Sequence, residues 1–452
     1  MLSASLIILI SIITIYLVTI IILNRKGILK KYNLSLYGPF LLIKTDRGRN
    51  LIYKLSRRKR FWLWFGNVSM VICVAMMVTT VFLLLWQSWV LTGHLSKEVA
   101  EKLPGINMVL IIPVVNPLLP IGYTILAIII AVVVHEFSHG ISGASSGLRI
   151  KSMGVLAFII PIGAFVEPDE EELKRLERKK RLRLFSAGPT ANILVAMICL
   201  IIFSFGMMGQ VCVASEGVGV YYVVKDSPAQ EIGMEFGSII NEINGSKIGN
   251  IDDFLRIMNR THANQSIEIV FYKNGRIVKK TVILADKYAF TQREEDRGKG
   301  FLGVIPSLNY RYELSLLKNP FTNFPRSFFY LYALPFSSLF GGFNPIIEPY
   351  TKFYEVKGIF SSNPSLFWSL ANAIYWIFWL NLAVGLFNAL PMIPLDGGYI
   401  LQDVFEALLD RFRIESRRKE KIRKTVMVTI SLFILFLVLY PLLLKYTYPL
   451  LH

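Results

Sequence analysis

Residues 131–140 are Ala-Val-Val-Val-His-Glu-Phe-Ser-His-Gly, and they close an apolar run that begins near Ile121. His135 and His139 are four residues apart, so on a helix they share one face, one turn from each other. Two neutral imidazoles there can bind one Zn²⁺, and Glu136 can take a proton from a water at the metal. Ionisable groups within a membrane span are costly and usually functional. The stretch therefore predicts a zinc site; the alternative is a helix end where these side chains only meet interfacial water.

The composition is that of a membrane protein. Of the 452 residues 54% are hydrophobic, and the mean hydropathy is +0.50, which is too apolar for an ordinary soluble protein. The net charge of +18 lies mostly in short loops beside apolar runs, which fits the positive-inside bias and anionic lipid better than nucleic acid. Cys73, Cys199 and Cys212 are scattered, so they form neither a disulfide framework nor a CxxC metal site.

Six apolar runs are each about long enough to cross ~30 Å of hydrocarbon. Basic segments in residues 25–60, 174–183 and 411–424 all fall on one side if the runs cross in turn, so we expect that side to be cytoplasmic and both termini to be external. The first run has no basic residues before it and no small-residue cleavage site, so we expect an uncleaved anchor. The predicted spans are residues 2–23, 61–91, 121–141, 184–208, 366–392 and 425–444.

Three further apolar segments are too short, or too interrupted by Pro and Gly, to be spans. Residues 107–120 are expected to dip into the outer leaflet against neighbouring helices. Residues 152–166 contain Pro161 and Gly163, and we expect a re-entrant hairpin under the metal site; a surface loop is the alternative. Residues 328–346 are apolar and aromatic but interrupted, and we expect an interfacial segment.

The sequence pattern changes in residues 214–285, which are not a continuous apolar run. They carry alternating and β-branched stretches typical of strands, together with an Asn274-Gly275 hairpin turn. Residues 251–258 predict a short helix with acidic residues in its first turn. We therefore expect a small α+β domain inserted between spans.

Two stretches of this domain resemble those of a PDZ domain. They are residues 227–234 (SPAQEIGM) and 237–245 (GSIINEING), with one departure at Ser238, where that family often has Asp. The resemblance implies capture of an extended peptide by strand addition. Residues 217–220 are then a candidate loop for a peptide carboxylate.

A catalytic zinc bound by two histidines lacks one protein ligand. The other three histidines lie in loops or at the terminus, so we expect an acid on another span. Asp396 follows the fifth apolar run, among prolines and a Gly-Gly pair that break the helix and let a side chain turn toward the metal. It is the candidate third ligand; the alternative is an aspartate that caps the next helix.

Three motifs in this order resemble the site-2 protease family of intramembrane zinc metalloproteases. They are residues 135–139 (HEFSH), 188–192 (GPTAN) and 388–397 (NALPMIPLDG), with the PDZ-like domain between the second and third. The expected fold class is a polytopic α-helical membrane protein, with about six transmembrane helices and an inserted α+β PDZ-like domain. The expected regions are an N-terminal membrane region (1–210), the PDZ-like domain (214–285), an interfacial linker (286–363) and a C-terminal membrane region with the third ligand (364–452).

The resemblance also implies a role for each motif residue. Glu136 would be the general base beside the zinc ion. The two asparagines would help to hold substrate or polarise its carbonyl. Apart from the resemblance, we expect the hairpin around Gly163 to Glu167 to pair with an extended segment of the unwound substrate. The candidate residues are His135, His139 and Asp396 as metal ligands, Glu136 as the catalytic base, and Asn192, Asn388, Gly163 and Phe165 for substrate binding.

The expected function is hydrolysis of peptide bonds within transmembrane segments, with Zn²⁺ as the cofactor. Expected partners are single-span membrane proteins, the lipid bilayer and a peptide tail at the PDZ-like domain, but not nucleic acid. We expect a prokaryotic plasma membrane, an active site near its cytoplasmic side and an external PDZ-like domain. The alternatives are a catalytically inactive PDZ-bearing scaffold and a membrane zinc protease that cuts prenylated peptides, whose third ligand is usually a glutamate.

Overall fold

The computed structural model describes residues 4–32, 34–109, 116–158, 160–307, 310–340, 344–412 and 414–451. The chain forms two compact units. The first combines Met1–Cys199 with Trp376–His452, and the second is Leu200–Tyr375. Because the HEFSH motif and Asp396 both belong to the first unit, the candidate metal centre lies within a single folded body.

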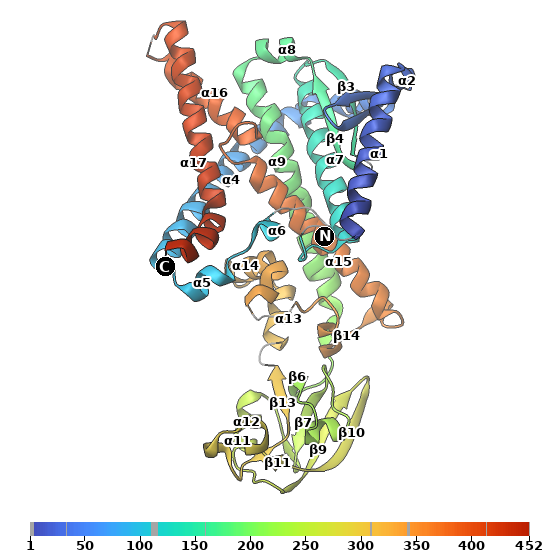
Figure 1. Cartoon of the computed structure of the whole chain (residues 1–452). Coiled ribbons are helices and arrows are strands. Elements are labelled where there is room, and N and C mark those ends of the chain that lie inside the picture. The colour runs from blue at the N-terminus through green and yellow to red at the C-terminus, as the bar shows by residue number, and fades with distance from the viewer. Residues whose placement is uncertain are drawn as a thin grey trace. The chain divides into compact units, whose positions relative to one another are not determined.

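Long apolar helices form most of the first unit (Figure 1). Five helices of the chain are long and apolar enough to cross a membrane, and they coincide with five of the predicted spans. The first predicted span falls in α1, of which Ile13–Arg25 is a shorter apolar helix among the described residues. The membrane-helix fold class is therefore confirmed, and the count of six spans stays a prediction. The five helices are Lys59–Gly93, Ile121–Ser145, Arg178–Gln210, Pro364–Asn388 and Ser416–Tyr448.

Shorter helices connect the long ones. α15 passes from the second unit into the first. The described helices of the first unit are α1 (Ala4–Arg25), α2 (Ile28–Lys31), α3 (Asp46–Ser56), α4 (Lys59–Gly93), α5 (Lys97–Lys102), α6 (Ile106–Val109), α7 (Ile121–Ser145), α8 (Glu170–Arg175), α9 (Arg178–Ile201), α15 (Pro364–Asn388), α16 (Asp396–Asp410) and α17 (Ser416–Leu451). Of the segment expected to dip into the outer leaflet, residues 110–115 lie outside the described residues.

The long helices differ in how much of their surface the protein covers. In α4 and α17 only 17% of the most apolar window is buried inside the protein, whereas in α15 the share is 56%. Large apolar side chains such as Val71, Phe82 and Leu432 stay exposed on α4 and α17. In water they would form an extensive apolar patch of the kind that soluble monomers avoid. Lipid is therefore the natural solvent of α4 and α17, while α15 is an inner helix.

A four-stranded antiparallel sheet packs against α7. Its order is β1 (Leu34–Tyr37), β2 (Phe40–Lys44), β3 (Ile150–Phe158) and β4 (Ile160–Pro168), so β4 is an edge strand. The predicted hairpin in residues 152–166 is thus a pair of β-strands and not a loop. Its entry into the membrane stays a prediction.

The sheet joins distant parts of the sequence. β2 pairs with β3 in the register Leu42 to Leu156, so the basic segment after α1 is not only a loop, as the sequence suggested, but supplies half of the sheet. Behind the sheet, Ile52 of α3 packs with Ile141 of α7 and Met153 of β3 in one small apolar core. This core fixes the sheet on the helix that carries the two histidines.

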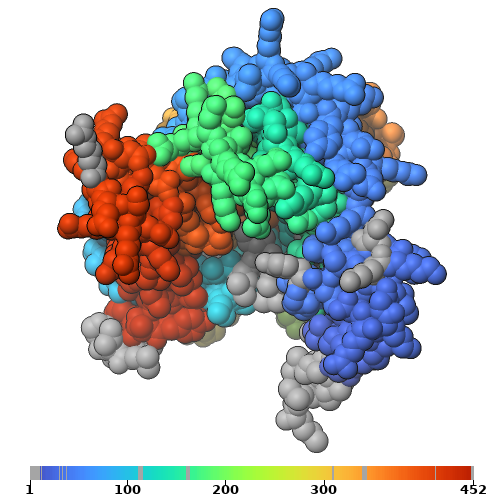
Figure 2. Space-filling view, turned by 90° about the horizontal axis from the view of Figure 1, so that it is seen from above, coloured from blue at the N-terminus to red at the C-terminus, as the bar shows by residue number. Residues whose placement is uncertain are grey.

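The basic segments of the sequence come to the surface at one end of the first unit. Figure 2 looks onto this end, where α3 and the start of α4 (blue), α8 and the start of α9 (green) and the α16–α17 connection (orange-red) lie together. The positive loops thus gather on one face of the first unit, while the side of the membrane that this face meets stays a prediction.

The second unit contains the predicted α+β domain. Its antiparallel sheet has the order β10-β9-β7-β6-β13, and β8 pairs with β7. Strands β9 and β10 are joined at Asn274 and Gly275, both with positive φ, as a tight hairpin turn requires. Ile240 and Phe271 on the sheet and Phe254 on α11 pack in its apolar core. The main elements are β6 (Val218–Val223), β7 (Ile239–Ile243), β8 (Ser246–Lys247), α11 (Ile251–Met258), β9 (Ser266–Lys273), β10 (Arg276–Ile283) and β13 (Val304–Ser307).

The structure overturns the candidate carboxylate-binding loop at residues 217–220. Residues 218–220 are the first three residues of β6, and β6 pairs with β7 on one side and with β13 on the other. A Cβ at Gly219 would lie 2.7 Å from the Phe353 ring. Among the described residues Gly219 thus has a paired strand on each side, which contradicts a free loop at this position.

The rest of the second unit consists of short elements. The predicted interfacial segment 328–346 overlaps α14 and the 3₁₀ helix η4, neither long enough to span a membrane; residues 341–343 lie outside the described residues. The elements are η1 (Ile202–Met207), η2 (Met208–Gln210), β5 (Val211–Val213), α10 (Pro228–Glu231), β11 (Ala285–Asp286), α12 (Tyr288–Thr291), η3 (Glu294–Asp296), β12 (Gly300–Phe301), α13 (Tyr310–Lys318), α14 (Arg326–Ala333), η4 (Leu334–Phe340), η5 (Tyr350–Phe353), β14 (Tyr354–Val356) and η6 (Gly358–Phe360).

Asp296 is expected to stabilise the β11–β12 region above about pH 4. Its carboxylate accepts hydrogen bonds from Lys287 Nζ at 2.7 Å and Thr291 Oγ1 at 3.0 Å, and the bond from Lys287 holds the pKa of Asp296 below its usual range. Because the folded pKa is depressed, this stabilisation is complete above the unfolded pKa of ~3.9 and is lost as the pH falls through the folded value.

We therefore predict that Asp296→Asn lowers the hydrogen-exchange protection of β11 and β12 at pH 7. The variant should also show a smaller loss of protection between pH 4 and pH 2 than the wild type. Glu295→Gln, at the exposed neighbouring carboxylate, is the matched control and should leave both properties unchanged. Equal effects of the two substitutions would show that the buried contacts of Asp296 are not the cause.

Candidate metal centre

Helix α7 places the two histidines of the HEFSH motif side by side. The Nε2 atoms of His135 and His139 are 3.0 Å apart, as the spacing of four residues predicts for one helix face. His135 is only 8% exposed. The paired imidazoles thus lie in the protein interior, which contradicts the alternative of a helix end in contact with interfacial water.

Asp396 completes the cluster from another part of the chain. Its Oδ2 atom lies 3.1 Å from Nε2 of His135 and 3.1 Å from Nε2 of His139. The three residues form a group whose ligand atoms all lie within 4.8 Å of one another. The structure therefore brings together the three side chains that the sequence proposed as ligands.

The shape of the chain around Asp396 depends on two glycines. Asp396 is the first residue of α16 and follows the turn that leaves α15. A Cβ on Gly397 would collide with the carbonyl oxygen of Ala389, and one on Gly398 would lie 2.6 Å from that of Met392. Only glycine lets α16 begin this close to the end of α15, and this close approach aims the carboxylate at the histidines.

The three ligand atoms fit a zinc ion. Two imidazole nitrogens and one carboxylate oxygen are a donor set typical of catalytic zinc. Bonds of about 2.0–2.1 Å in a tetrahedron would place ligand atoms ~3.3 Å apart, close to the separations of 3.0–3.1 Å observed. With three protein ligands, one position of such a tetrahedron is free for water or substrate.

Backbone and side-chain groups orient each imidazole. Nδ1 of His139 is 2.7 Å from the carbonyl oxygen of Leu184. Since a carbonyl only accepts hydrogen bonds, Nδ1 carries the proton, and in the neutral ring the lone pair is on Nε2, where the metal is expected. Such partners fix the tautomer and direction of a metal-binding histidine.

Asn192 has the corresponding position beside His135. Its Nδ2 lies 3.5 Å from Nδ1 of His135, while its Oδ1 is buried and has no hydrogen-bond partner among the described residues. Which end of a side-chain amide is the oxygen and which is the nitrogen is assigned from the hydrogen bonds that it makes. Turning the amide by 180° would let Oδ1 accept from Nδ1–H of His135 and would satisfy both groups. The structure thus places the Asn192 amide beside His135, one of the candidate metal ligands. The role of Asn192 in substrate binding stays a prediction.

Gly188 makes room for the two rings. A Cβ at this position would overlap Nε2 of His139 and would lie 2.8 Å from Nε2 of His135. The two candidate metal-binding rings are thus the nearest neighbours of Gly188 outside its own helix.

The carboxylate of Glu136 is tied to the sheet. Its Oε2 accepts a hydrogen bond of 3.1 Å from the backbone N–H of Val166 on β4. This N–H belongs to the edge strand and points away from β3, toward α7. The candidate base is therefore held beside an open strand edge.

An ion pair fixes α16 to α9. Nε of Arg181 lies 3.2 and 3.1 Å from the two carboxylate oxygens of Asp403, which is 3% exposed, and Nη1 also donates to the Leu176 carbonyl. Asp403 is two turns along α16 from Asp396. The pair thus restrains the helix that begins with the third ligand, and the sequence analysis did not identify it.

The remaining predicted residues lie on α15 and β4. Asn388 Nδ2 donates to the Val384 carbonyl of its own helix, at 3.0 Å. A Cβ on Gly163 of β4 would meet Val132 of α7 at 3.6 Å. Phe165 pairs with Gly154 in the β3–β4 register. Their proposed contacts with substrate stay predictions.

Comparison with known proteins identifies the family. The sequence pattern of "Peptidase family M50" matches residues 123–436, which include both halves of the metal centre. The chain belongs to peptidase family M50. It is a membrane zinc metallopeptidase of the site-2 protease type, and Zn²⁺ is its cofactor.

Relatives of this M50 peptidase occur in archaea and bacteria. An uncharacterized protein of Methanocaldococcus jannaschii is 28% identical over 387 residues, which are 84% of this chain and 81% of the relative. A Bartonella henselae protein with a provisional zinc metalloprotease name is 25% identical, over 68% of this chain and 97% of its own. The zinc metalloprotease RasP of Shouchella clausii is 22% identical, over 56% of this chain and 57% of its own.

A solved structure is similar to part of the second unit. It is the PDZ domain of the SdrC-like protein from Listeria monocytogenes, which matches 20% of this chain and 88% of its own at 18% identity, with a TM-score of 0.18.

We predict that Gly188→Ala weakens zinc binding roughly 5- to 150-fold, the factor that corresponds to the ~1–3 kcal/mol typical of an overpacked site. The added methyl group must displace one or both imidazoles. Zinc content of the purified protein, measured by mass spectrometry after dialysis against a series of buffered zinc concentrations, reports the change.

Gly122→Ala is the matched control, because a Cβ on this residue of α7 meets no atom within 4 Å. It should bind zinc as the wild type does. If Gly188→Ala also keeps its zinc, the close packing of α9 on the rings is not required for binding.

Proposed function

We propose that this M50 peptidase hydrolyses peptide bonds within the transmembrane segments of other membrane proteins. The observation that carries the proposal is the approach of Asp396 to within 3.1 Å of His135 and His139, which lie on an apolar helix long enough to cross a membrane. A catalytic centre on such a helix meets substrates that are themselves in the bilayer. In this proposal the three residues are the zinc ligands and Glu136 is the general base.

When bound, zinc would act as a Lewis acid and lower the pKa of a coordinated water toward ~7. Glu136 accepts the proton of the attacking water and delivers it to the amine that leaves. The N–H of Val166 holds the carboxylate in place for both transfers. Leu184 and Asn192 keep the imidazoles aligned while charge develops.

A helical substrate must be extended before its peptide bond can react, because helical hydrogen bonds shield the scissile carbonyl. We propose that the edge of β4 takes up the extended segment. Neighbouring N–H groups of a strand alternate in direction, so the N–H of Ala164 faces the same side as that of Val166, and no register shift separates the two. A substrate strand on this edge would lie beside Glu136.

The substrates are proposed to be single-span proteins of a prokaryotic plasma membrane, and the relatives from archaea and bacteria support this setting. The basic end of the first unit would face the cytoplasm and the PDZ-like domain would be external. A peptide tail could be added to β13, an end strand of the described sheet of that domain.

The first test is cleavage of reconstituted single-span proteins by the wild type and Glu136→Gln. We expect the variant to bind zinc normally and to cleave at least ~100-fold more slowly, the usual contribution of a general base. A zinc chelator should stop the wild type. An unchanged rate in Glu136→Gln would refute the role of the base, and a wild type that binds no zinc and cleaves nothing would favour the inactive scaffold.

The second test is Ala164→Pro, which removes the outward N–H of β4. Proline is tolerated on an edge strand where its missing N–H faces outward. We expect zinc content to be kept and cleavage to fall about 5- to 10-fold, as the loss of one hydrogen bond of ~1 kcal/mol or slightly more implies. Ala164→Val keeps the N–H and should cleave normally. Equal rates in both variants would exclude strand addition at this edge.

A further inference from the structure

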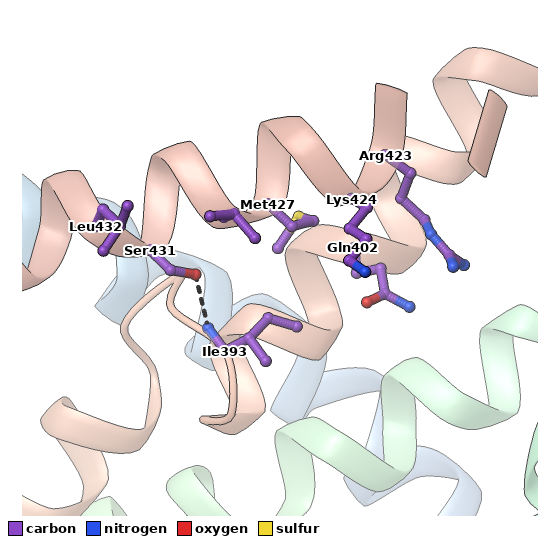
Figure 3. Close-up of a pocket in the computed structure, with 8 residues that line it drawn as sticks. Ile393, Gln402, Arg423, Lys424, Met427, Ser431 and Leu432 are labelled. Carbon is purple, nitrogen blue, oxygen red and sulfur yellow. Dashed lines mark hydrogen bonds between the residues drawn. The ribbon is translucent and has the colours of Figure 1, made fainter. Parts of the chain in front are cut away.

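A cavity of about 370 Å³ lies between α16 and α17, on the far side of the turn that leads to Asp396. Figure 3 shows its walls: the side chains of α17 form one long side, Gln402 comes from α16, and Ile393 from the turn closes the floor. None of its lining residues takes part in the metal centre described above. The peptidase activity therefore does not explain this cavity.

The two ends of the cavity differ in chemistry. Arg423, Lys424 and Gln402 lie at one end, whereas Leu432 lies at the other, beyond Met427 (Figure 3). Lys424 and Leu432 are eight positions apart on the helix, a rise of about 12 Å. The cavity thus has a cationic, hydrogen-bonding end and an apolar end. The distance between these ends is similar to the distance between the headgroup of a lipid and the upper part of its acyl chains.

The cationic end is at the level of the lipid headgroups. Arg423 and Lys424 are the last charged residues before an apolar run that continues to Leu444. Leu432, in the middle of that run, is 61% exposed. An apolar surface this open in the span of a membrane protein is covered by acyl chains.

One positive charge at this end is uncompensated. Arg423 forms an ion pair with Glu406 of α16. Lys424 is exposed and takes part in no ion pair among the residues that the structure describes. A phosphate with a net negative charge would complement Lys424, and the amide of Gln402 could donate a further hydrogen bond.

We propose that the groove between α16 and α17 binds an anionic phospholipid, with its phosphate at Lys424 and Gln402 and an acyl chain along Val428 and Leu432. A zwitterionic lipid fits the shape, but it leaves the charge of Lys424 unmatched.

The site borders the turn that carries the third metal ligand. The N–H of Ile393 donates to Oγ of Ser431 at 3.0 Å, which fixes the turn to α17 next to the cavity. Ile393 is three residues before Asp396. A lipid held here contacts the turn directly and stabilises the folded arrangement of α16 and α17, so its binding should be visible as thermal stabilisation of the full chain.

The test is thermal unfolding of the full chain in detergent, titrated with phosphatidylglycerol or with phosphatidylcholine of the same acyl chains. We expect phosphatidylglycerol to raise the Tm with saturation and phosphatidylcholine to have little effect. Lys424→Gln should weaken the apparent affinity for phosphatidylglycerol about fivefold, the factor equivalent to ~1 kcal/mol for one Lys at an anionic lipid surface.

Two further variants make the test specific. Arg418→Gln removes the same charge from the same helix about 120° away from Lys424, outside the cavity lining, and should keep the wild-type affinity within twofold. Val428→Trp fills the apolar end from an exposed position (50% exposed) and should abolish the saturable shift while leaving the Tm without added lipid near that of the wild type.

Equal stabilisation by the two lipids would overturn the proposal, as would equal effects of Lys424→Gln and Arg418→Gln, which would indicate diffuse attraction to the basic loop. An unchanged titration in Val428→Trp would exclude the cavity as the site. None of these measurements involves cleavage, so their failure would leave the proposed peptidase function untouched.

Discussion

The structure depends on the meeting of two imidazole nitrogens of α7 with one carboxylate oxygen at the start of α16. All three atoms lie within 3.0–3.1 Å of one another in a partly buried position. Three polar groups this close and this far from water are stable only if something satisfies their lone pairs. In the proposed metal centre zinc does so, and the surrounding contacts hold the three candidate ligands in place.

These supporting contacts come from every side of the cluster. Because Gly188 has no side chain, α9 packs directly against the two imidazole rings. The Leu184 carbonyl and the Asn192 amide lie at the outer nitrogens of the two imidazoles. The Arg181–Asp403 pair and the glycines after Asp396 restrain α16. Zinc binding and helix packing are thus parts of one arrangement.

Much of this arrangement could be predicted from the sequence, because it follows local patterns. The spacing of His135 and His139 follows the helical period, and the Asn274-Gly275 turn marks the hairpin between β9 and β10. The strands β1 and β2 could not be predicted, since β1 pairs with β2 and β2 pairs with β3, which is more than 100 residues away in the sequence. Nor could the parts played by the Leu184 carbonyl and the Val166 N–H, because every residue has these groups and no pattern distinguishes them.

The position of β4 has a consequence for selectivity. A strand edge offers only main-chain donors and acceptors, and these are the same for every amino acid except proline. If β4 receives the substrate, the identity of the side chains around the cut matters less than the ease with which the segment leaves its helix. Glycine and β-branched residues, which lower helix propensity, would then mark cleavable proteins better than any consensus sequence.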